Sequence, residues 1–187
     1  MKKLMVFAAI AMMASASMAA VGWYSDYILV STAGGADDYK WIGEDPSFGT
    51  EFNGSTFSIT LGQTLEFGAD MNYWSDNQDR TGGAYYWSVN GGAATEVIWT
   101  HSSLGGNNFN GLSPSDQNVA AGLGVGSHSV EVWAKSWGSS QGDSWLTGGG
   151  ANYDATIQVN AAIPEPATMS LLGLGALAMV LRRKIRK

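Results

Sequence analysis

Few side chains of this chain are of the kinds that perform catalysis. The 187 residues include two histidines, His101 and His128, and these do not stand at metal-ligand spacing from each other. Ser140 stands at the centre of a Gly-x-Ser-x-Gly pattern over residues 138–142. A nucleophile elbow needs a strand before its serine and a helix after it, and here no helical pattern follows. We therefore expect a loop at this pattern, no catalytic residues, and a protein that is not an enzyme.

Two tryptophans point instead to ligand binding. Residues 130–135 read Val-Glu-Val-Trp-Ala-Lys, an alternation that predicts a strand with one buried and one wet face. Trp133 and Trp137 then share the wet face with Lys135. Indoles on a polar face could stack against sugar rings. They could equally be covered by the loop 139–149, or by a partner sheet if the two faces are reversed.

Carboxylates close together in one loop suggest a second kind of site. Asp76, Asn77 and Asp79 place three oxygen-bearing side chains within four residues. Carboxylate and amide oxygens are the ligands that calcium prefers in proteins. The segment lacks the spacing and the glycine of an EF-hand, so a solvated turn is the alternative to a structural Ca²⁺ site. No other cofactor is expected.

The charges lie unevenly along the chain. Seven of the ten basic residues stand at its two extreme ends, whereas Lys40, Arg80 and Lys135 lie between them with fifteen of the sixteen acidic residues. Three positive and fifteen negative side chains give this middle part a formal net charge of −12. A surface so acidic repels nucleic acid and anionic headgroups, and we expect no nucleic-acid partner.

The composition favours a domain built of strands. The chain has no cysteine, which excludes disulfides, thiolate nucleophiles and cysteine-ligated zinc. The eight tryptophans all lie between the two ends, together with most of the 25 glycines. Aromatic residues favour strands and glycines favour turns. About 140 residues are enough to bury a core without disulfide bonds.

Five segments show the period-two alternation of half-buried strands. Strict alternation indicates one buried and one solvated face, as in an antiparallel sheet. The residues expected on the buried faces are Phe57, Ile59, Leu61, Leu65, Phe67, Ala69, Met71, Tyr85, Trp87, Val89, Val130, Val132, Ala134, Tyr153, Ala155, Ile157 and Val159.

Turn residues separate these segments. Asn90-Gly91-Gly92 is a strong hairpin signal between residues 85–89 and 95–99, and residues 61–63 predict a tight reversal between two further strands. We expect a single antiparallel β-sandwich over residues 20–160, immunoglobulin-like or jelly-roll, with its topology left open.

The N-terminus has the three parts of a secretory signal peptide. Lys2 and Lys3 precede an apolar stretch over residues 4–13, and small residues follow. Ser17 and Ala19 fit the pattern of a cleavage site, which places cleavage after Ala19, with Ala20 as the alternative. The signal peptide is therefore expected over residues 1–19.

The C-terminal residues 161–187 have a three-part order of their own. Pro164, Glu165 and Pro166 keep the backbone extended and out of any strand, as a protease requires. An apolar segment over residues 169–181 follows, short for a membrane span but able to cross a bilayer thinly with the residues before it. The chain closes on a basic block expected to stay cytoplasmic, which places the body outside: Arg182, Arg183, Lys184, Arg186 and Lys187.

This tail resembles the PEP-CTERM sorting signal. The matching parts are Pro164-Glu165-Pro166, the Leu/Gly/Ala-rich segment 171–181 and the basic block. The resemblance implies an exosortase, a membrane-embedded cysteine peptidase, as a transient partner that cuts near the motif. It also implies a precursor held in the inner membrane by the C-terminal transmembrane helix, and then a protein at the cell surface or secreted, often beside exopolysaccharide.

Three functions remain open at this point. The first is a non-enzymatic cell-surface or extracellular-matrix protein, and the second is a carbohydrate-binding module for exopolysaccharide. The third is a secreted hydrolase. An exposed row of aromatic side chains favours the second function over the first, and a cleft where histidine and carboxylates converge favours the third.

Overall fold

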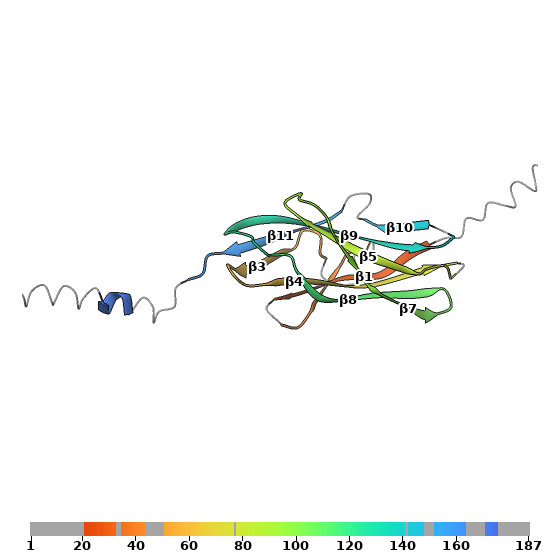
Figure 1. Cartoon of the computed structure of the whole chain (residues 1–187), viewed down its shortest axis with the longest axis horizontal. Coiled ribbons are helices and arrows are strands. Elements are labelled where there is room, and N and C mark those ends of the chain that lie inside the picture. Colours follow the sequence, from red (N-terminus) through yellow and green to blue (C-terminus); the bar gives the residue numbers. More distant parts are fainter. Residues whose placement is uncertain are drawn as a thin grey trace, which may run out of the picture.

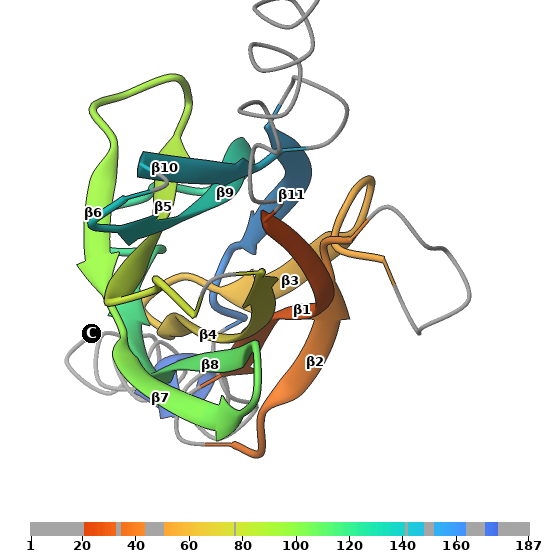
Figure 2. The same ribbon diagram turned by 90° about the vertical axis from the view of Figure 1, so that its right-hand side faces the viewer.

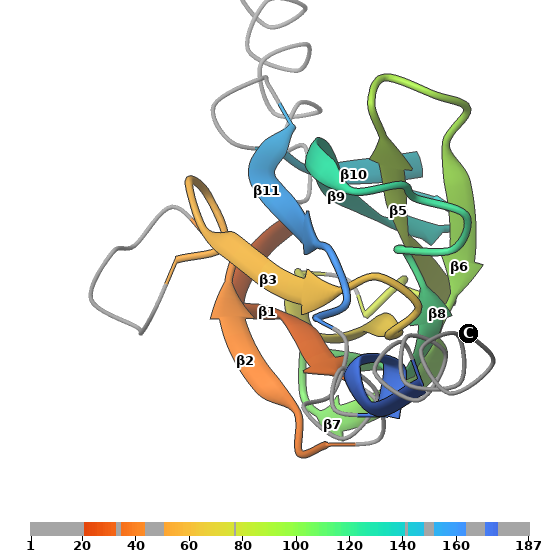
Figure 3. The same ribbon diagram turned by 90° about the vertical axis from the view of Figure 1, so that its left-hand side faces the viewer.

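The computed structural model describes residues 21–32, 35–43, 51–76, 78–140, 142–147, 152–163 and 171–175. The strands among them form two sheets that lie one over the other in a sandwich-like arrangement (Figures 2 and 3). The strands run along the long axis of the body, and β1 begins at the opposite end from the one where β11 ends (Figure 1).

The first sheet has five strands in the order β2-β1-β4-β8-β7. All of its neighbouring strands run antiparallel. The strand bounds are Val21–Thr32 for β1, Asp38–Trp41 for β2, Leu65–Ser75 for β4, Thr100–Gly105 for β7 and Asn108–Asn118 for β8.

The second sheet has six strands, five of them in the order β3-β11-β9-β5-β6. The sixth strand, β10, pairs with the C-terminal half of β9, and β11 pairs with the N-terminal half. The strand bounds are Thr56–Thr60 for β3, Gly82–Val89 for β5, Thr95–Ile98 for β6, Gly126–Gly138 for β9, Gly142–Leu146 for β10 and Tyr153–Asn160 for β11.

The core lies between the two sheets and is made of the side chains that alternation predicted. Each fully buried aliphatic or aromatic side chain stabilises the fold by about 1.5–3 kcal/mol. The predicted residues buried there are Ile59, Leu65, Phe67, Ala69, Met71, Tyr85, Val130, Val132, Ala134, Tyr153, Ala155, Ile157 and Val159. Phe57, Trp87 and Val89 are partly buried against them. Leu61 is the exception, because it lies in a turn after β3 and is 47% exposed.

Both predicted turns are present. Asn90 and Gly91 have positive φ angles of 52° and 66°, the combination that a two-residue turn between twisted strands requires. β5 and β6 pair on either side of this turn. Gly62, with φ at 90°, closes the other turn, and the amide of Gln63 donates to the carbonyl oxygen of Thr60. This second turn carries the chain from one sheet to the other, so its two strands do not pair.

The prediction of a purely antiparallel sandwich is wrong in one place. β3 and β11 run parallel, with Thr56 opposite Thr156 and Thr60 opposite Asn160. Alternation has the same period in parallel and antiparallel strands, so it cannot reveal the direction of a neighbour. The two strands are far apart in the sequence, and a parallel pair needs such a long connection. The choice between immunoglobulin-like and jelly-roll topology stays a prediction.

Five strands were not predicted from the sequence: β1, β2, β7, β8 and β10. In β1 the register with β4 shifts between Trp23 and Ser25, which breaks the period-two pattern. In β8 the register with β4 shifts opposite Phe67 and Ala69, which has the same effect. Pro114 lies beyond Leu112, the last residue of β8 that pairs with β7. Proline cannot donate to a ladder, and Pro114 is tolerated because the described pairing of β7 with β8 ends at Leu112.

The predicted signal peptide and most of the predicted tail lie outside the described residues. These parts are residues 1–19, the motif Pro164–Pro166 and the basic block 182–187. Residues 171–175 of the apolar segment are helical. In the part of the chain that the structure describes, no helix is long and apolar enough to span a membrane.

Candidate binding surface

Four large aromatic side chains lie together on the outer side of the second sheet. They are Tyr86 of β5, Trp133 and Trp137 of β9, and Trp145 of β10, and we call this surface the aromatic face. Strand register brings these rings together. Tyr86 lies opposite Trp133 in the pairing of β5 with β9, and Trp145 lies opposite Lys135 in the pairing of β10 with β9. The ammonium of Lys135 in turn contacts the ring of Trp137. The prediction that Trp133 and Trp137 share a face with Lys135 is confirmed.

The alternative in which the two faces of β9 are reversed is wrong. Val130, Val132 and Ala134 are all 0% exposed and belong to the core. Trp133 and Trp137 are half-buried, and Trp145 is 51% exposed. The segment predicted as a covering loop supplies β10 instead, which lies beside β9 in the sheet and adds a ring to the surface.

The rings contact one another closely. The centroids of Tyr86 and Trp133 are 5.6 Å apart, and their planes are nearly parallel at 6°. Tyr86 and Trp145 lie 6.0 Å apart at 35°. Pairs at such distances contribute about 0.5–1.5 kcal/mol beyond the area that they bury. Tyr86 and Trp133 therefore cover part of each other's ring surface, while Trp145 keeps half of its surface open to solvent.

Lys135 occupies the centre of the aromatic face. Its ammonium lies 5.0 Å from the ring centroid of Trp145, 5.4 Å from that of Trp137 and 6.0 Å from that of Tyr86. It also pairs with Asp143 at 3.4 Å, and its side chain is 19% exposed. Cation–π contacts of this kind fix the position of the ammonium.

A glycine allows Trp137 to lie low on the sheet. A Cβ atom at Gly82, the residue opposite Trp137 on β5, would come 2.8 Å from the indole Nε1. The ring therefore rests on the backbone of β5 at a place where any other residue would push it away. A flat indole on the outside of a sheet is a surface against which another flat group can pack.

Carboxylates surround the aromatic face. The hydroxyl of Tyr86 donates to Glu96 at 2.5 Å, and burial followed by this carboxylate raises the pKa of Tyr86. Glu131 accepts a hydrogen bond from Asn152 and lies opposite Asp154 in the register. Among the described residues of this face, Lys135 is accompanied by Glu96, Glu131 and Asp143, and Asp143 also lies near the buried Arg80.

Sequence reasoning missed Tyr86 and Trp145 as members of this surface. Tyr86 has the parity of a solvated position on β5, and it could have been placed here if the pairing of β5 with β9 had been known. Trp145 lies in a strand of five residues that shows no alternation, and nothing in the sequence pointed to it.

The structure gives Asp79 a local role. Its Oδ1 accepts from the amide and hydroxyl of Ser139 at 3.1 and 2.5 Å, and its Oδ2 accepts from the amide and the hydroxyl of Ser140. These bonds, the hydroxyl of Ser139 first, hold the pKa of Asp79 well below its usual range. The carboxylate therefore fixes the turn between β9 and β10.

The candidate calcium ligands are only partly placed. Asp76 is exposed after β4, Asp79 faces Ser139 and Ser140, and Asn77 lies outside the described residues. Within the described ranges, no three histidine, aspartate or glutamate side chains come close enough to hold a metal ion. The calcium site stays a prediction.

The possible catalytic residues do not converge. His101 of β7 contacts the hydroxyl of Tyr73 at 2.7 Å, and burial lowers the pKa of His101. His128 opens β9 and contacts Asn90 and the carbonyl oxygen of Gly124. Ser140 lies in a turn between two strands, whereas a nucleophile elbow needs a helix after its serine.

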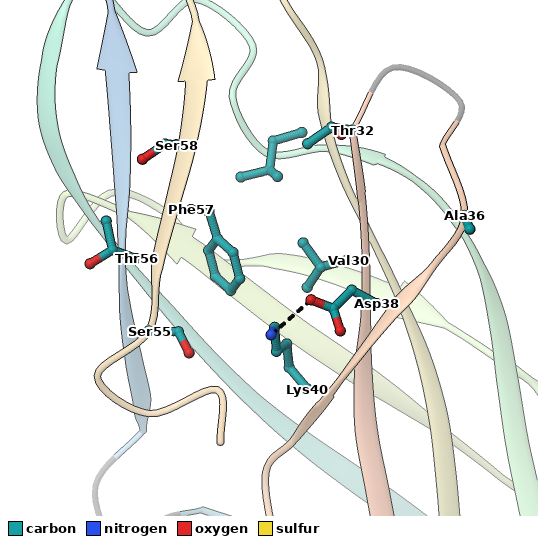
Figure 4. A pocket seen from close by; sticks show the side chains of 10 residues that line it. Val30, Thr32, Ala36, Asp38, Lys40, Ser55, Thr56, Phe57 and Ser58 are labelled. Carbon is teal, nitrogen blue, oxygen red and sulfur yellow. Dashed lines mark ion pairs between the residues drawn. The ribbon is translucent and has the colours of Figure 1, made fainter. Parts of the chain in front are cut away.

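A small polar cavity of about 310 Å³ opens between β2 and β3, at another edge of the sandwich. Lys40 and Phe57 point into it, and Lys40 pairs with Asp38 at 2.8 Å (Figure 4). This pairing occupies the one base among the described residues that line the cavity.

Comparison with known families concerns the tail. Residues 162–184 match the model of the PEP-CTERM protein-sorting motif, which includes Pro164, Glu165 and Pro166. The chain is therefore of the class of exported proteins that are sorted through their C-terminus. It carries a PEP-CTERM signal, and an exosortase is the peptidase that such a signal addresses. No curated protein matches the chain.

Proposed function

We propose that this exported protein is a non-enzymatic surface or matrix protein that binds glycan through its aromatic face. The observation that supports glycan binding most is the exposure of Trp145 beside Trp133, Trp137 and Tyr86 on the outer side of the second sheet. Indole and phenol rings stack on the apolar faces of sugar rings, and they also offer N–H and O–H groups to hydroxyls. The PEP-CTERM signal supports export of this surface, and polysaccharide outside the cell is the partner that we propose for it.

The route to that surface is also a proposal. The precursor is held in the inner membrane by the apolar segment 169–181, with the basic block 182–187 on the cytoplasmic side. An exosortase-type peptidase then cuts near Pro164-Glu165-Pro166, and the body reaches the cell surface or is secreted. Exopolysaccharide of the same cell is the glycan closest at hand.

The aromatic face can be tested ring by ring. We expect Trp145→Ala to weaken retention of the exported protein in affinity electrophoresis through the host exopolysaccharide by about five- to tenfold, since one stacked ring contributes about 1 kcal/mol. Trp133→Ala should weaken it as well. Tyr39→Ala is the control, because Tyr39 is a 50% exposed aromatic residue on the other sheet. Unchanged retention of folded Trp145→Ala would contradict the proposal.

A purely structural matrix protein is the second candidate. The observation that favours it is the close contact of Trp133 with Tyr86 and of Lys135 with three rings, since rings engaged in this way contribute to stability. In that case Trp133→Ala and Trp137→Ala would both lower the thermal midpoint, and neither would alter retention at a temperature where the variants are folded.

A further inference from the structure

Carboxylates border the aromatic face on two of its sides. Glu131 lies two residues before Trp133 on the same side of β9, which places the two residues about 7 Å apart along the strand. Asp154 of β11 lies opposite Glu131, and Glu96 of β6 lies opposite Tyr86. A ligand that rests on the rings therefore meets carboxylate oxygens at its margins.

Glu131 and Asp154 form a pair of like charges. Residues directly opposite each other in an antiparallel ladder have Cβ atoms about 4.5–5.5 Å apart, and like charges at this spacing repel. One oxygen of Glu131 accepts a hydrogen bond from the side-chain amide of Asn152 at 2.8 Å, and Asp154 is exposed. An ammonium group between the two carboxylates would remove the repulsion and form charge-assisted hydrogen bonds.

The bases of the body lie elsewhere or are already engaged. Residues 20–160 contain three basic side chains, and all three belong to the described residues. Lys40 pairs with Asp38 beside the cavity between β2 and β3. Arg80 is 3% exposed and donates to two backbone carbonyl oxygens, and Lys135 lies among the three rings. None of these described bases forms an ion pair with either member of the like-charged pair.

Asp143 differs from the other carboxylates of this surface. It lies 3.4 Å from the ammonium of Lys135 and close to the buried guanidinium of Arg80, so its charge is compensated. Glu96 instead accepts the neutral hydroxyl of Tyr86. The excess negative charge on this side of the second sheet therefore lies at Glu96 and at the like-charged pair.

The rings themselves already hold an ammonium group. The Nζ atom of Lys135 lies 5.0 Å from the ring centroid of Trp145 and 5.4 Å from that of Trp137. The faces of aromatic rings attract cations, and tryptophan attracts them most strongly. Trp145 is 51% exposed, so part of its ring remains open to a ligand. Rings bordered by carboxylates are thus suited to a sugar that also carries positive charge.

The charge of the whole body acts in the same direction at longer range. Residues 20–160 carry three basic and fifteen acidic side chains, a formal net charge of −12. A polymer of uronic acids is repelled by a body of this charge, whereas a polymer that carries ammonium groups is attracted to it.

We propose that the aromatic face binds a polysaccharide whose sugars carry free amino groups. The rings of Trp145 and Trp133 take the apolar faces of the sugars, and an ammonium group lies between Glu131 and Asp154. This inference rests on the proposed glycan binding and adds the charge class of the glycan to it.

Oligosaccharides of one length and different charge test the inference. The exported, processed protein is titrated in a calorimeter at about pH 6, where amino groups are protonated, with hexamers of glucosamine, of N-acetylglucosamine and of guluronate. We expect the glucosamine hexamer to bind about tenfold more tightly than the N-acetylated hexamer at low salt, because only the former carries ammonium groups. Screening in about 0.5 M salt should reduce this difference to about twofold. The guluronate hexamer should not bind.

Two variants locate the ammonium group. Glu131→Gln and Asp154→Asn should each weaken binding of the glucosamine hexamer about three- to fivefold and leave binding of the N-acetylglucosamine hexamer unchanged. Glu131→Gln retains an oxygen that can accept from Asn152. The matched control is Asp116→Asn, which removes the same charge from an exposed position of β8 on the first sheet and should change neither affinity.

The host exopolysaccharide tests the same point with the natural polymer. Its free amino groups are acetylated with acetic anhydride, which removes their charge and leaves the sugar rings in place. We expect acetylation to weaken retention of the parent protein in affinity electrophoresis at least fivefold.

Results of two kinds would overturn the inference. If the N-acetylglucosamine or guluronate hexamer binds as tightly as the glucosamine hexamer at low salt, or acetylation leaves retention unchanged, the charge class is wrong although glycan binding stands. The same follows if Asp116→Asn weakens binding as much as Glu131→Gln, because the effect is then one of net charge. If none of the hexamers binds and the host exopolysaccharide does not retain the protein, the proposed function itself fails.

Discussion

The hydroxyl of Tyr85 donates a hydrogen bond to the backbone carbonyl oxygen of Phe67, 3.0 Å away on the opposite sheet. Both side chains are fully buried, so this bond joins the two layers inside the core. Replacing Tyr85 with Phe keeps the ring and leaves the carbonyl without this donor. We expect a loss of about 1–2 kcal/mol in the free energy of unfolding, measured by urea denaturation. The control Tyr39→Phe should change it by less than about 0.5 kcal/mol.

The turn held by Asp79 gives a pH-dependent prediction. Bonds from Ser139 and Ser140 lower the pKa of Asp79 in the folded protein relative to the unfolded chain. Its stabilising effect is therefore complete above the ordinary aspartate pKa of about 4 and is lost as the pH falls through the lowered value. We expect Asp79→Asn to have a lower thermal midpoint than the parent at pH 6, and the difference to shrink below pH 4. A difference that is constant from pH 6 to pH 2 would contradict this role.

A glycine inside the first sheet is predicted to be irreplaceable. A Cβ atom at Gly68 would lie 2.6 Å from backbone atoms of Ser113 and Pro114, where the register between β4 and β8 shifts. Backbone cannot move aside as a side-chain end can, so Gly68→Ala should cost about 1–3 kcal/mol of unfolding free energy. Gly124→Ala is the matched control, because nothing lies within 4 Å of a Cβ atom there. Equal thermal midpoints of the two variants would refute the close contact.

The sorting signal predicts where the chain is cut. Val159 is the last buried residue of β11, and Ile163, directly before the motif, is 89% exposed. The two prolines of the motif predict a backbone that forms neither strand nor helix. In a host that contains the sorting peptidase, we expect the intact mass of the exported protein to lack the basic block 182–187. Replacing Pro164 and Pro166 with Ala should leave an uncut precursor in the membrane fraction. A mature protein that still ends in Arg182 to Lys187 would show that the tail is an ordinary anchor.

The sequence was most informative where one face of a strand is buried and the other is wet. Val130, Val132 and Ala134 alternate with polar neighbours, and this alone placed Trp133 on the outside. The alternation did not reveal strands where a bulge or a proline interrupts the period of two, as beside Trp23 in β1 and at Pro114 in β8. The partners of Trp133 could not be predicted either, because Tyr86 and Trp145 reach it through strand pairing between distant segments.

The position of β11 between β3 and β9 bears on how the body responds to a pulling force. If the tail is held in a membrane as proposed, a pull from that end enters the body at Asn160, the last residue of β11 (Figure 1). The strand is hydrogen-bonded on both sides, parallel to β3 and antiparallel to β9, so the load shears two ladders at once and cannot peel an edge strand away. We therefore expect the strand next to the tail to resist such a pull better than an edge strand that is paired on one side only.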